Sequence, residues 1–361
     1  MSTFAQISEL VRQEALRAGF DLAGVAGVHD FSELDYFPEW IASGYAGEMR
    51  YLESRTEAGH LKRASLRSAA PWARSVIVSA INYNTAEPYS TEVTHPERGW
   101  ISRYAWSRED YHEVVMRRLR ALETSLHEVS TEPFQTRCYV DTGPLIERVY
   151  AKYAGVGWIG KNTCILNQKL GSWLFLGVIL TSLELQPDAP APDRCGTCTR
   201  CIQACPTHAF IAPYQLDASK CISYLTIEKR GPISHDLRKG IGQQVFGCDI
   251  CQDVCPWNRK APATNNEDFE TRPELFNPAL EWLAQLDHAE FARAFRRSPV
   301  KRAKLSGLRR NAAIAMGNSG KNKFVPTLRR LSHDKDETVA EAAKWALGQL
   351  GDANSQRDNH P

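Results

Sequence analysis

The spacing of the cysteines constrains this chain more than any other feature of its sequence. Eight of the ten cysteines lie between residues 195 and 256. In the first run, two, two and three residues separate the cysteines and a proline follows the last, which gives Cys195, Cys198, Cys201 and Cys205. A second run closes in the same way after a longer gap, which gives Cys221, Cys248, Cys251 and Cys255. Runs closed by Cys-Pro are typical of bacterial ferredoxins that hold two four-iron clusters.

The ferredoxin pattern also predicts which cysteines share a cluster. In those proteins, the fourth cysteine of each run ligates the cluster of the other run. One predicted set is therefore Cys195, Cys198, Cys201 and Cys255, and the other is Cys205, Cys221, Cys248 and Cys251. In the second set, Cys221 replaces the first cysteine of a stretched run.

Two other uses of eight cysteines are possible. Two zinc sites would need the same number of ligands, but zinc usually takes two separated Cys-x2-Cys pairs. Disulfides would need an oxidising compartment, and such closely spaced cysteines have poor geometry for them. Iron–sulfur clusters are therefore the preferred prediction, and zinc is the alternative. The remaining thiols, Cys138 and Cys164, are expected to be buried as small apolar side chains.

The composition is that of an ordinary globular protein whose 361 residues favour two or three domains. The formal net charge is only +2, so binding of a polyanion would depend on local clusters of basic residues. The first twenty residues mix charges into an apolar period, which does not resemble a signal peptide. The longest apolar run, residues 173–180, is too short to span a membrane. A cytoplasmic protein with reduced thiols is expected.

The first half of the chain alternates apolar strand patterns with helical patterns. Strands are predicted at residues 21–27, 75–83 and 136–140, and helices at residues 4–19, 110–129 and 145–154. This alternation indicates an α/β domain over residues 1–185. Proline-rich residues 187–192 are predicted to link it to a ferredoxin-like domain over residues 186–262.

Residues 263–352 are predicted to be mainly helical and contain a short repeat. Gly317 and Gly320 recur, with similar small neighbours, as Gly348 and Gly351. Small residues on one face of each helix resemble HEAT-like repeats. Two copies cannot form a free solenoid, so we expect these helices to pack on the body of the protein. Residues 353–361 are expected to be a disordered tail.

Two motifs in the first half have both a structural and a functional interpretation. Asp141 follows a predicted strand and precedes Gly143-Pro144, and on position alone a helix N-cap is favoured. A carboxylic acid at the end of a strand could instead donate a proton. Residues 155–162 contain G-x-G-x-x-G, but they follow a predicted helix rather than a strand, which argues against a nucleotide-binding loop.

A basic run near the C-terminus indicates a polyanionic partner. Residues 296–310 hold seven cations and no anion: Arg296, Arg297, Lys301, Arg302, Lys304, Arg309 and Arg310. A solvated helix face usually mixes charges of both signs. Seven like charges repel one another and favour contact with phosphates, so nucleic acid is the predicted partner.

Several motifs, taken with the cysteines, resemble the epoxyqueuosine reductase family. They are Val140-Asp-Thr-Gly-Pro, Trp158-Ile-Gly-Lys-Asn, Cys221-Ile-Ser-Tyr-Leu-Thr, Gly247-Cys-Asp-Ile-Cys-Gln and Leu308-Arg-Arg-Asn-Ala-Ala. The resemblance covers residues 1–352. It implies a multidomain protein of α+β or α/β class, with a cobalamin-binding α/β domain, a ferredoxin-like two-cluster domain and a C-terminal HEAT-like helical domain.

The resemblance further implies an oxidoreductase that reduces epoxyqueuosine to queuosine at the wobble position of tRNA, the last step of queuosine synthesis. Electrons would pass through two [4Fe-4S] clusters to cobalamin, and Asp141 matches the family's proton donor. The residues expected to line the cobalamin are Arg63, Ser102, Asp141, Ile165, Leu176, Ser223 and Asp249. Lys229 and the basic run would meet a tRNA with a GUN anticodon. The protein is expected to act as a monomer with an unidentified electron donor.

A histidine ligand below the cobalt is not expected. Asp110-Tyr-His112 lacks the glycine of a D-x-H-x-x-G motif, so the cofactor should bind without its own base and without a protein ligand there. Two alternative functions remain. A corrinoid reductase of another substrate, such as a reductive dehalogenase, usually has an export signal and no basic tail. An electron-transfer protein of the ferredoxin type would leave the first 185 residues without a role.

Overall fold

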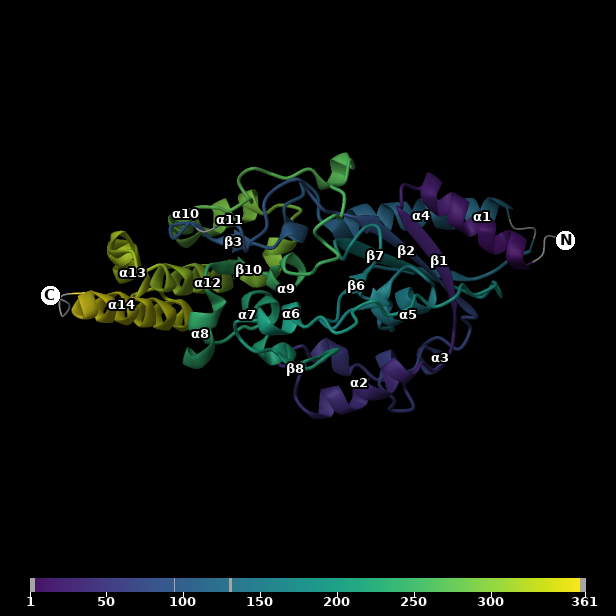
Figure 1. The fold of residues 1–361 in the computed structure, drawn as a ribbon, viewed down its shortest axis with the longest axis horizontal. Coiled ribbons are helices and arrows are strands. Elements are labelled where there is room, and N and C mark those ends of the chain that lie inside the picture. The colour runs from purple at the N-terminus through teal and green to yellow at the C-terminus, as the bar shows by residue number, and fades with distance from the viewer. Residues whose placement is uncertain (1–3, 94, 130–131, 358–361) are drawn as a thin grey trace.

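The computed structural model describes residues 4–93, 95–129 and 132–357 (Figure 1). Its main sheet has the order β1-β2-β7-β4, formed by β1 (Leu22–Gly27), β2 (Ser75–Asn82), β7 (Leu174–Thr181) and β4 (Thr136–Tyr139). The three predicted strands are confirmed to within one residue at each end. All three neighbouring pairs are antiparallel, however. The sheet is therefore of the α+β type, and the α/β prediction is wrong for this domain.

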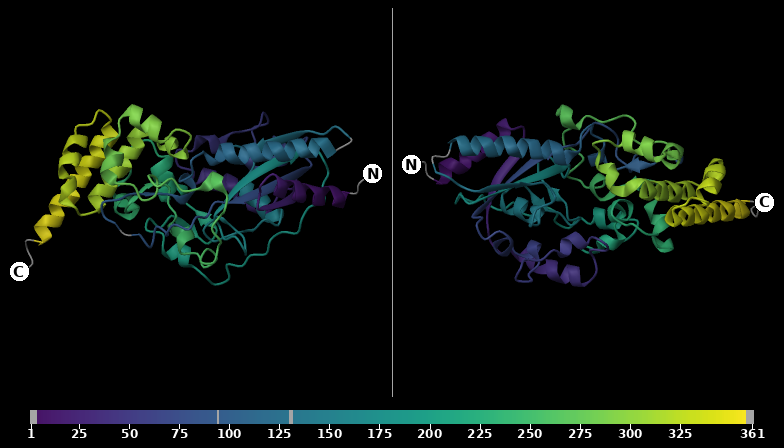
Figure 2. Two further views of the ribbon diagram at one scale, coloured as in Figure 1. Left: turned by 90° about the horizontal axis from the view of Figure 1, so that it is seen from above. Right: turned by 180° about the vertical axis from the view of Figure 1, so that it is seen from behind.

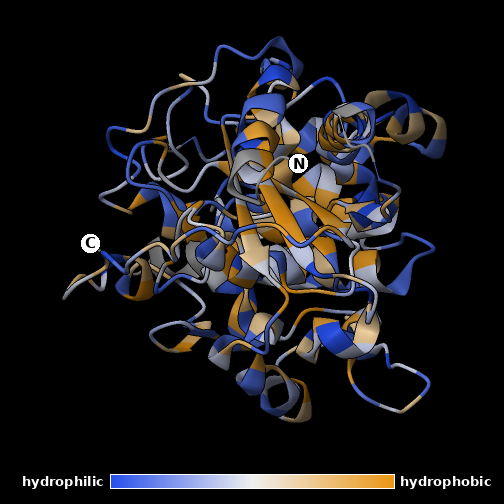
Figure 3. Ribbon diagram, turned by 90° about the vertical axis from the view of Figure 1, so that its right-hand side faces the viewer, coloured by the Kyte–Doolittle hydropathy of each residue, from blue (hydrophilic) through white to orange (hydrophobic). Residues whose placement is uncertain are grey.

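Helices cover both faces of this sheet (Figures 1 and 2). On one face lie α1 (Phe4–Arg17) and α4 (Tyr111–Val129), packed on strand residues such as Ile77 and Ile179. On the other face, α2 (Ser32–Ala42), α3 (Leu66–Ala69) and α5 (Glu147–Tyr153) pack on Val76 and Val178. Alternate residues of one strand thus enter two different cores, because side chains in a strand alternate between faces. These mostly apolar strands appear largely orange near the centre of Figure 3.

The cysteine-containing region is built from short elements. They are α6 (Arg200–Gln203), β8 (Phe210–Ala212), β9 (Gln215–Leu216), α7 (Ile222–Ile227), α8 (His235–Ile241), β10 (Gln244–Phe246) and α9 (Ile250–Asp253). Strand β10 pairs in parallel with β3 (Trp100–Ile101), which belongs to the first half of the chain. The predicted boundary near residue 185 is therefore crossed by a two-stranded sheet and by the core around it.

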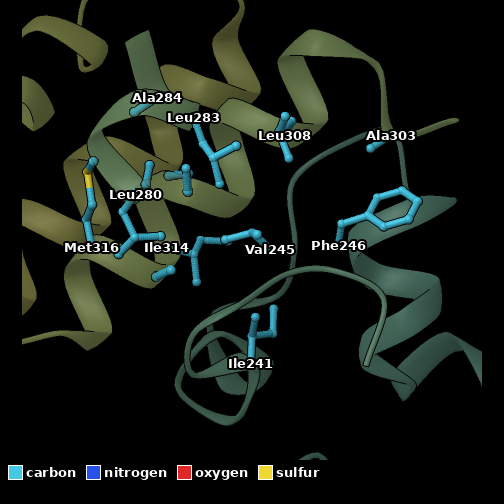
Figure 4. Packing of buried hydrophobic residues seen from close by; sticks show 14 of the residues in the cluster. Ile241, Val245, Phe246, Leu280, Leu283, Ala284, Ala303, Leu308, Ile314 and Met316 are labelled. Atoms are coloured by element: carbon cyan, nitrogen blue, oxygen red, sulfur yellow. The ribbon is translucent and has the colours of Figure 1, made fainter. Parts of the chain in front are cut away.

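Five helices follow toward the C-terminus: α10 (Leu280–Gln285), α11 (His288–Ala294), α12 (Lys304–Asn318), α13 (Val325–Leu331) and α14 (Glu337–Arg357). Their apolar residues share one core with β10, as Figure 4 shows for Ile314, Leu280 and Val245. A Cβ on Gly317 would lie 2.8 Å from the Cα of Ala346, so this glycine permits close contact of α12 and α14. The predicted packing on the body is confirmed.

The C-terminal tail differs from the prediction. Helix α14 continues to Arg357, so the expected disorder of residues 353–357 is wrong, and residues 358–361 lie outside the described residues. Within the described ranges, no helix is long and apolar enough to cross a membrane.

Arg310 joins the helical region to the cysteine-containing region. Its side chain is 1% exposed and donates hydrogen bonds to the carbonyl oxygens of Leu225 at 2.6 Å, Gly231 at 2.8 Å and Lys229 at 2.9 Å. Burial lowers the pKa of Arg310 to about 10, and the guanidinium still remains charged at neutral pH. The cation satisfies carbonyl groups in the last turn of α7 and just beyond its end.

We expect Arg310→Met to destabilise the protein by about 3 kcal/mol, because it leaves buried carbonyl groups without a donor. Chemical denaturation followed by circular dichroism would measure this loss. Arg296→Met is the matched control, since Arg296 belongs to the same basic run but is exposed. Equal stability of the two variants would contradict the structural role of Arg310.

Candidate functional site

The eight cysteines of the two runs fall into two groups in space. Burial raises the pKa of the Cys201 thiol, and the nearby Cys195 and Cys198 add to this effect. Burial likewise raises the pKa of Cys255 to about 11, and there the neighbouring thiols are Cys195, Cys201 and, outside the two runs, Cys164. The four that belong to the runs are the first set that the ferredoxin spacing predicts.

The second group has the predicted members too. Burial raises the pKa of the Cys248 thiol, and its closest thiol neighbours are Cys221 and Cys205. Cys251 has Cys248 and Cys221 beside it. Across the described residues, no three metal-binding side chains converge on a position for a single ion. Two sets of four thiols, each spread over several loops, are nevertheless brought together by the fold.

Cys164 adds a further thiol to the second group. Its side chain forms a hydrogen bond with Cys251, which lowers the pKa of Cys164 and raises that of Cys251. The sequence predicts only an apolar role for Cys164, and this contact was not foreseen. Cys138 is buried in the core of the sheet domain as expected.

The glycine-rich segment supports both cysteine loops. It forms a hairpin of β5 (Trp158–Ile159) and β6 (Ile165–Leu166) instead of a loop that opens a helix. The Lys161 Nζ donates to the carbonyl oxygens of Gly196 at 2.6 Å and Cys198 at 3.0 Å. Asn162 Nδ2 donates to the carbonyl of Cys251 at 3.3 Å. The segment therefore lacks the strand–loop–helix context of a nucleotide-binding motif.

Asp141 lies just beyond β4 in an unusual backbone conformation. Its φ is 58°, in the left-handed region that residues other than glycine rarely adopt. Helix α5 begins only at Glu147, and Ile146 occupies its N-cap. The helix-cap interpretation of Asp141 is therefore wrong. Its side chain remains 47% exposed, so the carboxyl group can meet another molecule.

Three titratable side chains surround the Asp141 carboxyl and its backbone. The Tyr111 hydroxyl donates a hydrogen bond to Asp141 Oδ2. His112 Nε2 lies 3.5 Å from the same oxygen. Glu147 Oε1 accepts the backbone N–H of Asp141 at 2.8 Å, and burial together with the Asp141 charge raises the pKa of Glu147. Asp141 is thus held by neighbours from α4 and α5.

Further aromatic and charged side chains lie around this acid. Burial raises the pKa of Tyr104, whose ring meets that of Tyr111 edge to face at 5.8 Å between centroids. Tyr51 is 49% exposed, and burial of its remainder and the Glu228 charge raise its pKa. Arg302 and Arg63 oppose that shift, while Asp141 adds to it. Side chains from five separate parts of the chain therefore act on one another at this place.

The residues expected to line cobalamin do not all have side chains that are exposed to a ligand. Arg63 is 9% exposed and donates to the Tyr51 carbonyl at 3.1 Å. Ile165 is buried, whereas Leu176 and Ser223 are partly exposed. Ser102 and Asp249 are buried, and the Ser102 hydroxyl donates to Asp249.

Asp249 also accepts hydrogen bonds from the Trp100 indole at 2.9 Å and the Arg103 backbone at 2.7 Å. The polar side-chain atoms of Ser102 and Asp249 are therefore used to join β3 to the second cysteine loop. Any contact of these two residues with a cofactor would involve other atoms.

The basic run is neither continuous helix nor free of anions in space. It is divided between a short 3-10 helix (Pro299–Ala303) and α12. Residues from distant segments pair with its cations: Arg297 with Glu109 and Glu113, Arg302 with Glu228, and Arg309 with Asp334. Lys229 pairs with Glu48. Arg310 is buried, so its prediction as a tRNA contact is wrong.

Three exposed cations of the run form no ion pair within the described ranges: Arg296, Lys301 and Lys304. The sequence did not predict that four further residues lie beside Asp141. They are Tyr51, Tyr104, Tyr111 and Glu147. Tyr111 and His112 are adjacent in the Asp110-Tyr-His112 segment, which the sequence related only to a cobalt-ligand motif.

Comparison with known proteins agrees with this arrangement. A family model for a "4Fe-4S double cluster binding domain" matches residues 194–258, and one for "Epoxyqueuosine reductase QueG, DUF1730" matches residues 63–142. The epoxyqueuosine reductase of Xanthomonas campestris pv. campestris is 39% identical over 344 residues, covering 94% of this chain and 95% of the relative.

Two solved structures of epoxyqueuosine reductases have the same fold. One, with an epoxyqueuosine-modified tRNA-Tyr stem loop, has a TM-score of 0.87 and 30% identity over 97% of this chain and 91% of that one. The other, from Bacillus subtilis, has its catalytic aspartate loop swung out of the active site, with a TM-score of 0.85 and 29% identity over 96% and 91% of the two chains. The chain belongs to the epoxyqueuosine reductase family.

Proposed function

We propose that this protein reduces epoxyqueuosine to queuosine in the anticodon loop of tRNA, with Asp141 as the proton donor. The observation that carries this proposal is the position of Asp141. Its exposed carboxyl sits on a loop with a left-handed backbone, beside Tyr111 and His112 of α4. The related Bacillus subtilis enzyme has a catalytic aspartate on a loop that can leave the active site.

The two thiol groups fit two [4Fe-4S] clusters. Each group has four cysteines, and each draws its fourth member from the other run, as in two-cluster ferredoxins. The match of residues 194–258 to a double cluster domain supports this assignment. When bound, such clusters would carry electrons one at a time from an external donor.

The surroundings of Asp141 fit a large flat cofactor such as cobalamin. Leu176 lies on a central strand yet is partly exposed, and Tyr51 is a large exposed aromatic residue. Arg63 lies beside Tyr51, with its guanidinium carbon 5.9 Å from the ring centroid. These residues, with Ile165 and Ser223, would hold the cofactor. Bound cobalamin would supply a strongly reducing cobalt centre.

The protein's own contribution to the reaction is proton transfer and positioning. As the carbon–oxygen bonds of the epoxide break, the departing oxygen needs a proton, and the Asp141 carboxyl is placed to give it. Burial and the charge on Asp141 raise the pKa of Tyr111, so this phenol stays protonated and donates a hydrogen bond to the carboxylate. Tyr111 thereby orients Asp141.

The tRNA would be held mainly by exposed cations of the C-terminal region. Arg296, Lys301 and Lys304 are exposed, and Arg297 and Arg302 are partly neutralised by Glu109, Glu113 and Glu228. Phosphate contacts of this kind give affinity without reading the base sequence. The modified base itself would have to reach Asp141.

We expect Asp141→Asn to lower the single-turnover rate about 100-fold or more, because the amide cannot replace the acid as proton donor. Iron content and affinity for the tRNA should stay unchanged. The measurement is mass analysis of nucleosides from epoxyqueuosine-containing tRNA after anaerobic reaction. Asp35→Asn, an exposed aspartate on α2, is the control and should react as the wild type does. A fully active Asp141→Asn variant would rule out this role.

A second prediction concerns Cys221, the most separated member of its set. Cys221→Ala should reduce the iron content from about eight to about four atoms per chain, since one cluster loses a ligand. Cys164→Ala should keep all of the iron, because Cys164 is a neighbour and not a member of the set. Iron and sulfide analysis after reconstitution would distinguish them. Loss of iron in the Cys164 variant instead would mean that the sets are assigned wrongly.

A further inference from the structure

Removal of an epoxide oxygen requires two protons, and this inference rests on the proposed function. Both carbon–oxygen bonds break, a carbon–carbon double bond forms and the oxygen leaves as water. The two electrons come from a low-potential external reductant by way of the cofactors. Asp141 can hold only one proton at a time. Another group must therefore return a proton to it before the oxygen can leave as water.

His112 has the position that this second step needs. Its Nε2 lies 3.5 Å from Asp141 Oδ2, which is within ion-pair distance and long for a hydrogen bond. Catalytic hydrogen bonds are often long before the substrate binds and shorten in the complex. The His112 side chain is 27% exposed, so its ring can exchange protons with water.

Asp110 fixes the orientation of the His112 ring. Its Oδ1 lies 2.7 Å from His112 Nδ1 and also accepts the backbone N–H of His112 at 3.1 Å. Burial acts to raise the pKa of Asp110, but the His112 hydrogen bond and the Arg302 charge lower it overall, so Asp110 is an anion. Asp110 accepts a hydrogen bond from Nδ1–H, and this holds the ring with its other nitrogen, Nε2, facing Asp141.

We propose that His112, held by Asp110, returns a proton from its Nε2 to Asp141 Oδ2 after Asp141 has protonated the departing oxygen. The transfer leaves Asp141 neutral and His112 as neutral imidazole. Asp141 then gives the second proton, water leaves, and His112 takes a new proton from solvent. His112 acts through Asp141 and does not touch the substrate. An imidazole suits this step because its charge ordinarily changes between pH 5 and 8.

The other titratable groups near His112 are less suited to this step. The Tyr111 ring lies against the imidazole at 4.0 Å between centroids, and its raised pKa keeps it a hydrogen-bond donor only. Tyr104 is likewise kept protonated by burial, and Arg302 carries a fixed charge. Glu147 is the main alternative donor of a proton to Asp141, because its pKa is raised and it is in contact with Asp141. Its Oε1 accepts the Asp141 backbone N–H, which indicates a role in holding the loop.

The test compares His112→Gln with Glu147→Gln in the reconstituted holoenzyme. Single-turnover rates are measured with excess reductant from about pH 5.5 to 8.5, the range in which histidine titrates. Glutamine can still accept or donate a hydrogen bond but carries no transferable proton. We expect His112→Gln to slow the reaction about 100-fold at neutral pH and to move the alkaline limb of the rate profile toward lower pH. Binding of the tRNA stem loop should not change.

His127→Gln is the matched control, since His127 lies on the same helix, in its last turn, and should leave the profile unchanged. Added imidazole should partly restore the rate of His112→Ala and not that of Asp141→Asn. A wild-type profile in His112→Gln would overturn the proposal, as would a profile moved only by Glu147→Gln. Failure of the proposed function is a different result, because the wild-type protein would then leave epoxyqueuosine unchanged at every pH.

Discussion

The buried carboxyl group of Asp249 connects the second cysteine group to the segment that carries Tyr104 and leads to Asp141. It lies next to Cys248 in the second cysteine group and accepts hydrogen bonds from Trp100, Ser102 and Arg103. Burial raises the pKa of Asp249, although the hydrogen bonds from these donors oppose the shift. Tyr104 follows directly in the chain and packs on Tyr111, which holds Asp141. The thiols and the acid therefore have a fixed relative position.

The charged side chains of the C-terminal region also find their partners in distant parts of the chain. In the sequence, residues 296–310 are strongly basic, but in the fold several of these cations meet carboxylates in or just before α4, just after α7 and between α13 and α14. One of them, Arg310, is buried and donates hydrogen bonds inside the protein, so it adds no charge to the surface. The positive surface is thus reduced to a few residues, while Arg302 reaches toward Asp110 and the tyrosines near Asp141. Under the proposed function, this would place positive charge that meets tRNA next to the proposed proton donor.

The sequence was a good guide wherever the signal was local. Cysteine spacing predicts both thiol sets, and apolar periodicity predicts three strands of the main sheet to within one residue. It failed where the outcome depends on distant partners. Strand direction is decided by connections that periodicity does not reveal, so the antiparallel sheet was missed. The burial of Arg310 depends on carbonyl groups some eighty residues away in the chain. The hydrogen bond between Ser102 and Asp249 likewise joins distant parts of the chain. Tyr111, His112 and Glu147 also meet around Asp141 only in the folded protein.

The central claim is most directly tested by one measurement on the wild-type protein. The chain is reconstituted anaerobically with iron, sulfide and cobalamin, reduced, and mixed with tRNA that carries epoxyqueuosine. Mass spectrometry of the digested tRNA should then show queuosine, which lacks one oxygen atom, in place of epoxyqueuosine. Unchanged epoxyqueuosine, with both clusters and cobalamin fully bound, would contradict the account.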